Sequence, residues 1–383
     1  MRRFLRVLTP VAALALLAAA PASAQFGGIT LPPSGNNQYG KITQGIGPVR
    51  VSIEYNSPKV HSPTGEDRHG KIWGGLVPYG MANLGFGDCG DQCPWRGGAN
   101  ENTVFTTSHD VKIQGQPLPA GSYGVFFIPG KEEWTIAFSR NHTSWGSYFY
   151  DAKEDALRVQ AKPEKSEYHE WLTYEFVERK PDRATAALQW EDLQLPFTIT
   201  VDNVASLYMD IVRQELRSSP GFAWQNWMSA ARYSLDSKTN LEEGLRWAEK
   251  AAHGPGLGQE NFQTMTTLAD LQTANGKADE AKKTMDRALV LPGTGPMEIH
   301  QYGRQLLAEK RNEEALKVFQ LNARRFPNAW PVHMGLARGH AALGHKKEAL
   351  AEARLALPQA PDETNRKGVE ALIQSLEGTG QGS

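Results

Sequence analysis

The chain has 383 residues, enough for two domains of ordinary size. Hydrophobic residues make up 40% of the sequence, charged residues make up 22%, and the formal net charge is -1. This composition excludes a fibrous or wholly disordered chain, and the charge balance excludes a broadly basic nucleic-acid binder.

The first 24 residues predict a secretory signal peptide. Three arginines precede the apolar run 7–20, and the small residues 22–24 form a cleavage site before Gln25. The apolar run is shorter than the roughly 20 residues that span a bilayer. An uncleaved N-terminal anchor is the alternative interpretation. We expect an exported protein, periplasmic or secreted, that has no transmembrane segment after cleavage near Ala24.

Residues 25–44 are rich in Gly, Pro and Asn and predict an extended lead-in. Residues 45–202 alternate short apolar runs with turn signals, and residues 49–55 alternate apolar and polar side chains as a half-buried strand does. The expected strands are 49–55, 103–107, 111–113, 121–128, 134–138, 157–161, 171–178, 184–190 and 197–201. Antiparallel strands without intervening helices predict an all-β sandwich of the jelly-roll or immunoglobulin-like kind.

The chain has two cysteines, Cys89 and Cys93, in a glycine-rich loop. An exported protein meets an oxidising compartment, which favours a disulfide between them. A metal site would need further ligands, and a redox motif normally has two intervening residues. We expect a local disulfide that shapes the loop.

Residues 203–220 predict a connector helix, and residues 221–376 predict helical repeats. Ala281, Ala315 and Ala349 each follow a glutamate and are spaced by 34 residues, which is the period of tetratricopeptide repeats. Asp362 predicts the start of a final capping helix, and residues 377–383 predict a disordered tail. The expected fold is therefore a β-sandwich followed by an all-α tetratricopeptide solenoid.

Several motifs in the β-rich half resemble the exported bacterial domain-of-unknown-function family 2911. They are the segments KIWGGLVPYG at 71–80, WRGGANE at 95–101, LPAGSY at 118–123 and WG at 145–146. The resemblance covers about residues 45–202, and its continuation with the repeats is similar to longer members of that family. The chain departs from the family in the insertion 81–94, which contains both cysteines. The resemblance implies no established activity.

One candidate ligand site lies in this half, at Tyr79, Trp95, Arg96, Asn100 and Glu101. An arginine fork suits a carboxylate or phosphate, amide and carboxylate groups suit hydroxyls, and aromatic rings stack on a ligand's apolar face. The site would then bind a sugar or a small anion. The alternative is structural: Arg96 and Glu101 pair to fix a loop, and the tryptophans belong to the core.

A second candidate site lies in the repeats. The inward-facing positions of the first helix of each repeat are expected at 263, 266 and 270, at 297, 300 and 304, and at 334 and 338. His300 and Arg304 are four residues apart on one helix face, and Arg304 and Arg338 are 34 residues apart, so both guanidinium groups should line one groove. Two arginines suit an acidic peptide or a C-terminal carboxylate. Alternatively, they pair with acids of the repeats or face solvent.

The leading hypothesis is a binding or adaptor protein. Its β-domain would contact a small ligand, a glycan or another envelope component, and its repeat groove would contact a protein or peptide. The alternative is a periplasmic enzyme directed at glycans or esters, with Arg96, Asn100 and Glu101 in its site, and a third reading is self-association through the repeats. The motifs assign no catalytic residue, no cofactor, no metal site and no nucleic-acid partner.

Overall fold

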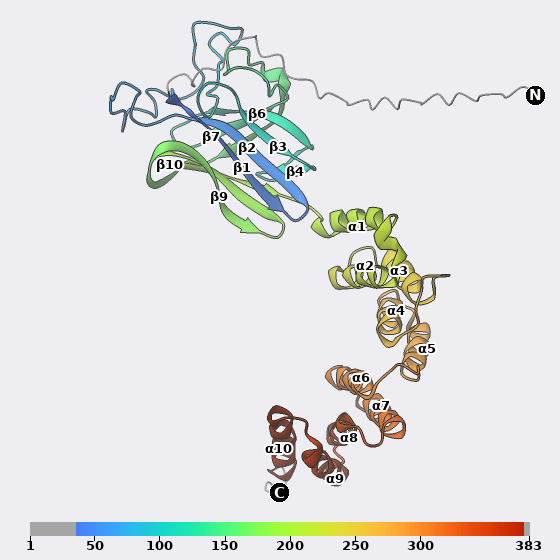
Figure 1. Ribbon diagram of the computed structural model, residues 1–383. Coiled ribbons are helices and arrows are strands. Elements are labelled where there is room, and N and C mark those ends of the chain that lie inside the picture. The colour runs from blue at the N-terminus through green and yellow to red at the C-terminus, as the bar shows by residue number, and fades with distance from the viewer. Residues whose placement is uncertain (1–35, 379–383) are drawn as a thin grey trace, which may run out of the picture. The chain divides into compact units, whose positions relative to one another are not determined.

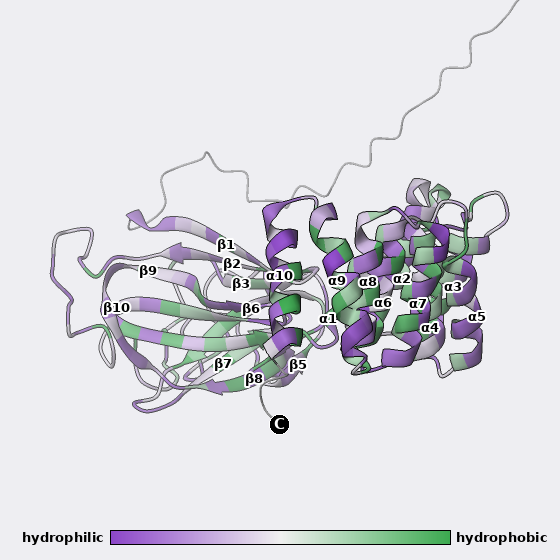
Figure 2. Ribbon diagram, turned by 90° about the horizontal axis from the view of Figure 1, so that it is seen from below, coloured by the Kyte–Doolittle hydropathy of each residue, from purple (hydrophilic) through white to green (hydrophobic). Residues whose placement is uncertain are grey.

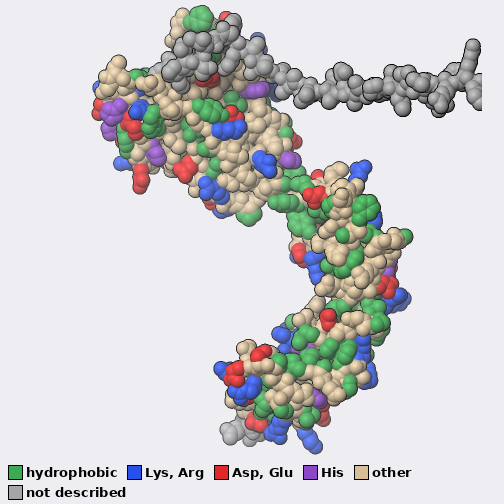
Figure 3. All heavy atoms as spheres, viewed as in Figure 1, with side chains coloured by type: hydrophobic (Ala, Val, Ile, Leu, Met, Phe, Trp, Pro, Cys, Tyr) green, Lys and Arg blue, Asp and Glu red, His purple; other side chains and the backbone are tan. Residues whose placement is uncertain are grey.

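The computed structural model describes residues 36–378 and divides the chain into two compact units, Met1–Asp202 and Asn203–Ser383 (Figure 1). The signal peptide, most of the lead-in and residues 379–383 of the expected tail lie outside the described residues. None of the described helices combines the length and apolarity that a membrane span requires. Basic and acidic side chains are interspersed on the face drawn in Figure 3.

The first unit consists of two antiparallel sheets. The larger has the strand order β1-β2-β3-β6-β7-β8, and the smaller has the order β5-β4-β10-β9. The strands of the larger sheet are β1 (Gln38–Ile46), β2 (Val49–Ser57), β3 (Thr103–Thr107), β6 (Gly121–Ile128), β7 (Trp134–Ser139) and β8 (Asp155–Ala161). The strands of the smaller are β4 (Val111–Ile113), β5 (Gln116–Leu118), β9 (Glu164–Lys180) and β10 (Arg183–Thr200).

Aromatic side chains from the two sheets meet in the core. The ring centroids of Tyr55 on β2 and Tyr174 on β9 are 4.9 Å apart, and those of Phe138 on β7 and Phe197 on β10 are 6.4 Å apart. All four side chains are buried, so the sheets face each other across a shared apolar layer. The expected all-β domain is confirmed, whereas the observed strand order does not establish the jelly-roll or the immunoglobulin type.

Two expectations about the strands need correction. The lead-in was expected to reach residue 44, but Gln38–Ile46 is strand β1 and pairs along its whole length with β2. Because most β1 side chains are exposed or half-exposed, this strand lacks the apolar alternation that would reveal it. The segments 184–190 and 197–201 belong to one strand, β10. Glu191 adopts a left-handed conformation (φ 56°) and forms a bulge, after which the pairing with β9 continues.

The second unit consists of antiparallel helix pairs that follow helix α1. Its helices are α1 (Val204–Glu215), α2 (Trp224–Ser237), α3 (Leu241–His253), α4 (Phe262–Ala274), α5 (Ala278–Ala288), α6 (Pro296–Ala308), α7 (Asn312–Arg325), α8 (Trp330–Ala342), α9 (Lys346–Ala356) and α10 (Glu363–Gly378). Helices α4, α6 and α8 begin 34 residues apart, as do α5, α7 and α9, which is the tetratricopeptide spacing. The expected repeat fold is confirmed.

The helical core runs through successive helix pairs. Hydrophobic segments of the helices (green in Figure 2) alternate with hydrophilic ones, as in helices that bury one face. Met209 of α1 is fully buried in this core, and Tyr208 of α1 contacts Tyr233 of α2 with ring centroids 6.0 Å apart. Helix α1 is therefore packed on the first helix pair.

Phe319 of α7 determines how closely two neighbouring helices pack against it. Its ring is fully buried, and it lies against Gly303 of α6 and Gly335 of α8. A Cβ atom at Gly303 would lie 2.4 Å from the Phe319 ring, a distance that real Cβ atoms do not adopt. Glycine at this position therefore makes room for the ring.

We expect Gly303→Ala to destabilise the helical unit by roughly 1–3 kcal/mol, because the added methyl group overpacks the core against Phe319. The matched control is Gly368→Ala in α10, where the structure has no atom within 4 Å of the new Cβ. That change should stabilise the protein by roughly 0.5–1 kcal/mol through helix propensity. Denaturant unfolding followed by far-UV circular dichroism measures both, and equal effects of the two substitutions would contradict this account.

Candidate functional site

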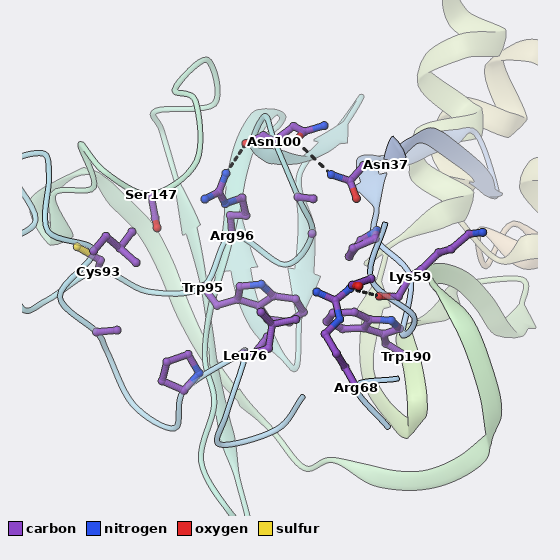
Figure 4. Close-up of a pocket in the computed structure, with 18 of the residues that line it drawn as sticks. Asn37, Lys59, Arg68, Leu76, Cys93, Trp95, Arg96, Asn100, Ser147 and Trp190 are labelled. Carbon is purple, nitrogen blue, oxygen red and sulfur yellow. Dashed lines mark hydrogen bonds between the residues drawn. The ribbon is translucent and has the colours of Figure 1, made fainter. Parts of the chain in front are cut away.

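A pocket of about 560 Å³ opens in the β-unit, and we call it the Arg96 pocket (Figure 4). Its walls come from the long loop 58–102 between β2 and β3, from residues just before β1, from the loop after β7 and from β10. Of the predicted site residues, Trp95, Arg96 and Asn100 line this pocket, whereas Tyr79 and Glu101 do not. The structure therefore brings together three of the five predicted residues.

A cluster of four tryptophans lies beside the Arg96 pocket, and two of them, Trp95 and Trp190, line it. Trp95 of the loop is stacked on Trp190 of β10, with ring centroids 6.2 Å apart and an interplanar angle of 14°. Trp73 of the same loop makes edge contacts with Trp95, Trp190 and Trp134 at 5.1–5.8 Å. Trp134 and Trp190 are 1% exposed, so the loop is fixed against the sheets by buried aromatic surface.

The Arg96 side chain is held by its neighbours without an acid. Its Nη1 donates to the Asn100 carbonyl oxygen at 2.6 Å. The guanidinium carbon lies 5.2 Å from the Trp145 ring centroid and 5.7 Å from that of Tyr148, which are cation–π distances. Gly146 has a positive φ of 69°, and a Cβ atom there would lie 2.8 Å from the Arg96 guanidinium carbon. A glycine is thus required for this placement.

The two predicted residues outside the pocket have other partners. Glu101 Oε2 accepts a hydrogen bond of 2.9 Å from Asn56 Nδ2. Within residues 36–378, Arg96 and Glu101 form no ion pair, so the expected structural pair is wrong. The Tyr79 ring lies against Gly74 and is 43% exposed. The trio Arg96, Asn100 and Glu101 therefore does not converge on one cavity.

Sequence reasoning missed Arg68, which also lines the pocket. Its Nε donates to the Val60 carbonyl at 2.9 Å and its Nη2 to the Lys59 carbonyl at 2.8 Å. In the sequence, Arg68 stands in the charged stretch 66–71, which has the composition of a solvated loop. No periodicity distinguishes it from its neighbours. His61 and His69, nearby in this loop, contact Glu170 and Asp192 respectively.

A second pocket, of about 270 Å³, lies in the helical unit, and we call it the Arg304 pocket. It is lined from α6, α8 and α10, and all three predicted groove residues, His300, Arg304 and Arg338, line it. Met297, Trp330 and Met334 contribute its apolar surface. The 34-residue period placed the two arginines correctly, because equivalent helices present equivalent faces.

The Arg304 pocket holds positive charge without a counter-charge. Within residues 36–378, neither Arg304 nor Arg338 has an ion-pair or hydrogen-bond partner. Burial lowers the pKa of Arg338, and the nearby Arg304 lowers it further. Both guanidinium groups line one pocket, where their like charges repel each other.

His300 lies beneath these arginines. Its side chain is 6% exposed, and its ring packs on Phe319 with centroids 5.6 Å apart. Burial lowers the pKa of His300 to about 4, with Arg338 and Arg304 as further causes. Its Nδ1 is buried and has no hydrogen-bond partner within the described residues. His300 is thus neutral at physiological pH.

Asp270 does not share this pocket, although the repeat pattern placed it on the same inward surface. It lines a separate cavity of about 490 Å³ between the second and third helix pairs, α4–α5 and α6–α7. Its carboxylate lies 3.3 Å from Arg232 Nη1, and burial raises its pKa above the ordinary value.

The β-unit is similar to a known protein family. Residues 37–199 match the family model described as "Protein of unknown function (DUF2911)". The expected family resemblance of this unit is confirmed. The match begins just before β1, earlier than the boundary expected from the sequence. The chain matches none of the curated proteins with which it was compared.

The chain is also similar to solved tetratricopeptide structures. One is a tetratricopeptide repeat protein from Parabacteroides merdae, with 14% identity, a TM-score of 0.33, and coverage of 46% of this chain and 68% of that chain. Another is YrrB, a TPR protein described as having an unusual peptide-binding site, with 18% identity, a TM-score of 0.30, and coverage of 44% and 84%. A third is pilF from Pseudomonas aeruginosa, with 16% identity, a TM-score of 0.31, and coverage of 42% and 71%.

The buried His300 predicts a specific pH dependence of stability. Its pKa is about 4 in the folded protein and 6.5 in the unfolded chain, so between these values only the unfolded state binds the proton. The stabilisation is complete above pH 6.5, and roughly 3 kcal/mol of it is lost as the pH falls towards 4.

His300→Gln removes this titrating group, so the stability of the variant should fall less between pH 7 and pH 4. Denaturant titrations of both proteins at a series of pH values measure the difference. If the two proteins lost equal stability over this range, His300 would not be a buried neutral side chain.

Proposed function

We propose that this protein is a binding protein whose helical unit captures an acidic segment of a partner protein in the Arg304 pocket. The observation that carries the proposal is the presence of two guanidinium groups in one pocket without a carboxylate partner. Like charges at close range raise the free energy of the empty pocket, and a carboxylate relieves that repulsion. The ligand group that fits is therefore an anion.

The other walls favour a peptide over a free inorganic anion. Met297 is 45% exposed at the rim, and Met334 and Trp330 lie deeper in the same pocket. These flexible or aromatic side chains suit an apolar side chain next to the bound carboxylate. The combination fits a segment in which Asp, Glu or the C-terminal carboxylate stands beside a Leu or Met.

We propose further that the protein is exported, on the evidence of residues 1–24 alone. Binding would then take place in the periplasm or outside the cell. The enzyme hypothesis finds less support, since Glu101, its expected acid, does not line the Arg96 pocket.

A labelled peptide pair tests the function. The probe is a fluorescein-labelled peptide with the sequence Ser-Gly-Glu-Glu-Met-Glu-Glu-Leu, and its matched control replaces every Glu by Gln and amidates the C-terminus. Fluorescence anisotropy should give tighter binding of the acidic peptide, weakened by added salt. Arg304→Gln/Arg338→Gln should lower its affinity by about tenfold or more, the size expected for lost charge-assisted hydrogen bonds.

Arg217→Gln/Arg324→Gln is the charge-matched control variant, because both positions are exposed and lie outside the pocket. Its affinity should equal that of the wild type. Equal losses of affinity in the two double variants would show that net charge alone causes the effect, which would contradict the proposal. No loss of affinity in Arg304→Gln/Arg338→Gln would also contradict it.

The export proposal predicts that the mature chain begins at Gln25. Mass spectrometry of the N-terminal peptide, after separation of periplasm, medium and cytoplasm, measures this. A full-length chain that retains Met1 and stays in the cytoplasm would overturn the proposal.

A further inference from the structure

Every charged side chain that lines the Arg96 pocket of the β-unit is basic. Lys59, Arg68 and Arg96 line it, and none of the described lining residues is an Asp or Glu. The guanidinium groups of Arg68 and Arg96 donate to backbone carbonyls alone and form no ion pair within residues 36–378. Each is half-buried, so its charge is partly desolvated without compensation from an acid. A ligand that brings an anionic group offsets this cost, whereas a neutral ligand does not.

The mouth of the same pocket is apolar. Leu76, Leu84 and Trp145 line it and are 50%, 40% and 52% exposed. Phe86, which is 69% exposed, contacts Phe149 at 6.1 Å beside it. Large apolar side chains gathered around one opening are unusual on a free protein surface and mark an interaction site.

The insertion 81–94 forms one wall of this mouth. Ala82, Leu84 and Cys93 line the pocket from it, and the Cys89–Cys93 disulfide closes its tip with Cα atoms 5.1 Å apart. The backbone N–H groups of Asp88 and Cys89 donate to the Tyr148 carbonyl, which ties the insertion to the loop that carries Trp145. The apolar rim is therefore a built structure that joins two loops.

Charged and apolar side chains adjoin one another around a platform of two tryptophans. In Figure 4, Trp95 and Trp190 occupy the centre of the pocket, with Arg96 near Asn100 on one side and Arg68 beside Trp190 on the other. Trp145 of the rim lies 5.2 Å from the Arg96 guanidinium carbon, so a ligand with an anionic group at Arg96 has the Trp95 and Trp145 rings beside it. Such a ligand needs both an anionic head and an apolar body.

We propose that the Arg96 pocket binds an amphipathic anion, with a carboxylate, phosphate or sulfonate group at Arg96 and an apolar chain or ring on Trp95 and the rim around Trp145. This site is independent of the peptide pocket in the helical unit. Arg96 keeps donors free besides the Nη1 that bonds to Asn100, and a guanidinium fork binds such oxyanions through two parallel hydrogen bonds.

The test uses two fluorescent probes with nearly the same apolar body. The first is 8-anilinonaphthalene-1-sulfonate, and the second is N-phenyl-1-naphthylamine, which lacks the sulfonate. The full chain carries Arg304→Gln/Arg338→Gln in all measurements, so that the Arg304 pocket offers no arginine to the sulfonate. The anionic probe should bind at least tenfold more tightly than the neutral one.

In this background, Arg96→Gln should weaken the sulfonate probe by about tenfold and leave the neutral probe within twofold. Arg50→Gln, an exposed position on β2 outside the pocket, is the matched control and should change neither affinity. Leu84→Ser should weaken both probes. Equal binding of the two probes, or equal loss of both in Arg96→Gln with an unchanged melting temperature, would overturn the proposal.

Competition identifies the source of the anion. Dodecanoate or dodecyl phosphate should displace the sulfonate probe, and the tighter competitor indicates a carboxylate or a phosphate head. Dodecyl maltoside has the same chain with a neutral sugar head and should compete at least tenfold less well. Displacement by the maltoside at equal concentration would contradict an anion site.

Discussion

The position of the loop between β2 and β3 depends on burial of tryptophan. Backbone hydrogen bonds join the segment 58–102 to the strands at separate points, such as the pair between Trp95 and Phe127, and side chains must hold the stretches between them. Trp73 and Trp95 supply this, because each packs on Trp134 and Trp190 of the sheets. Fully burying an indole removes about 200 Å² from water, worth roughly 5 kcal/mol in gross terms, and the half-buried Trp73 and Trp95 gain part of this. The Arg96 pocket exists because these rings hold the loop.

Both candidate sites leave arginines without acid partners inside a well-packed frame. In the β-unit, backbone carbonyls and aromatic faces position Arg96, and in the helical unit the regular helices position Arg304 and Arg338. Arg96 and Arg338 are half-buried, and a partly buried charge without a counter-ion is unfavourable. The packing around Trp190 and Phe319 supplies the stability that such sites require.

The sequence predicted the helical site better than the β-site for a physical reason. A 34-residue repeat fixes which side chains share a helix face, so the sequence alone places His300, Arg304 and Arg338 together. In the β-unit, Trp95, Arg96 and Asn100 were found through one motif, but loops have no period. Arg68 therefore carried no signal, and Glu101 was assigned to the pocket only through its nearness in sequence. Strand β1 was not predicted for a similar reason, since an exposed edge strand has no apolar alternation.

Phe319 sets how closely α6 and α8, which line the Arg304 pocket, approach each other. Gly303, Gly335 and Gly339 all lie against its ring, so α6 and α8 approach to the thickness of one phenyl group. Arg304 directly follows the first of these glycines, and Arg338 directly precedes the last. The distance between the Arg304 and Arg338 side chains therefore depends on the contact of Phe319 with these glycines in the core. A relative of this protein with a smaller or larger side chain at this position would present its arginines at another separation, and would select ligands whose oxygens are spaced to match.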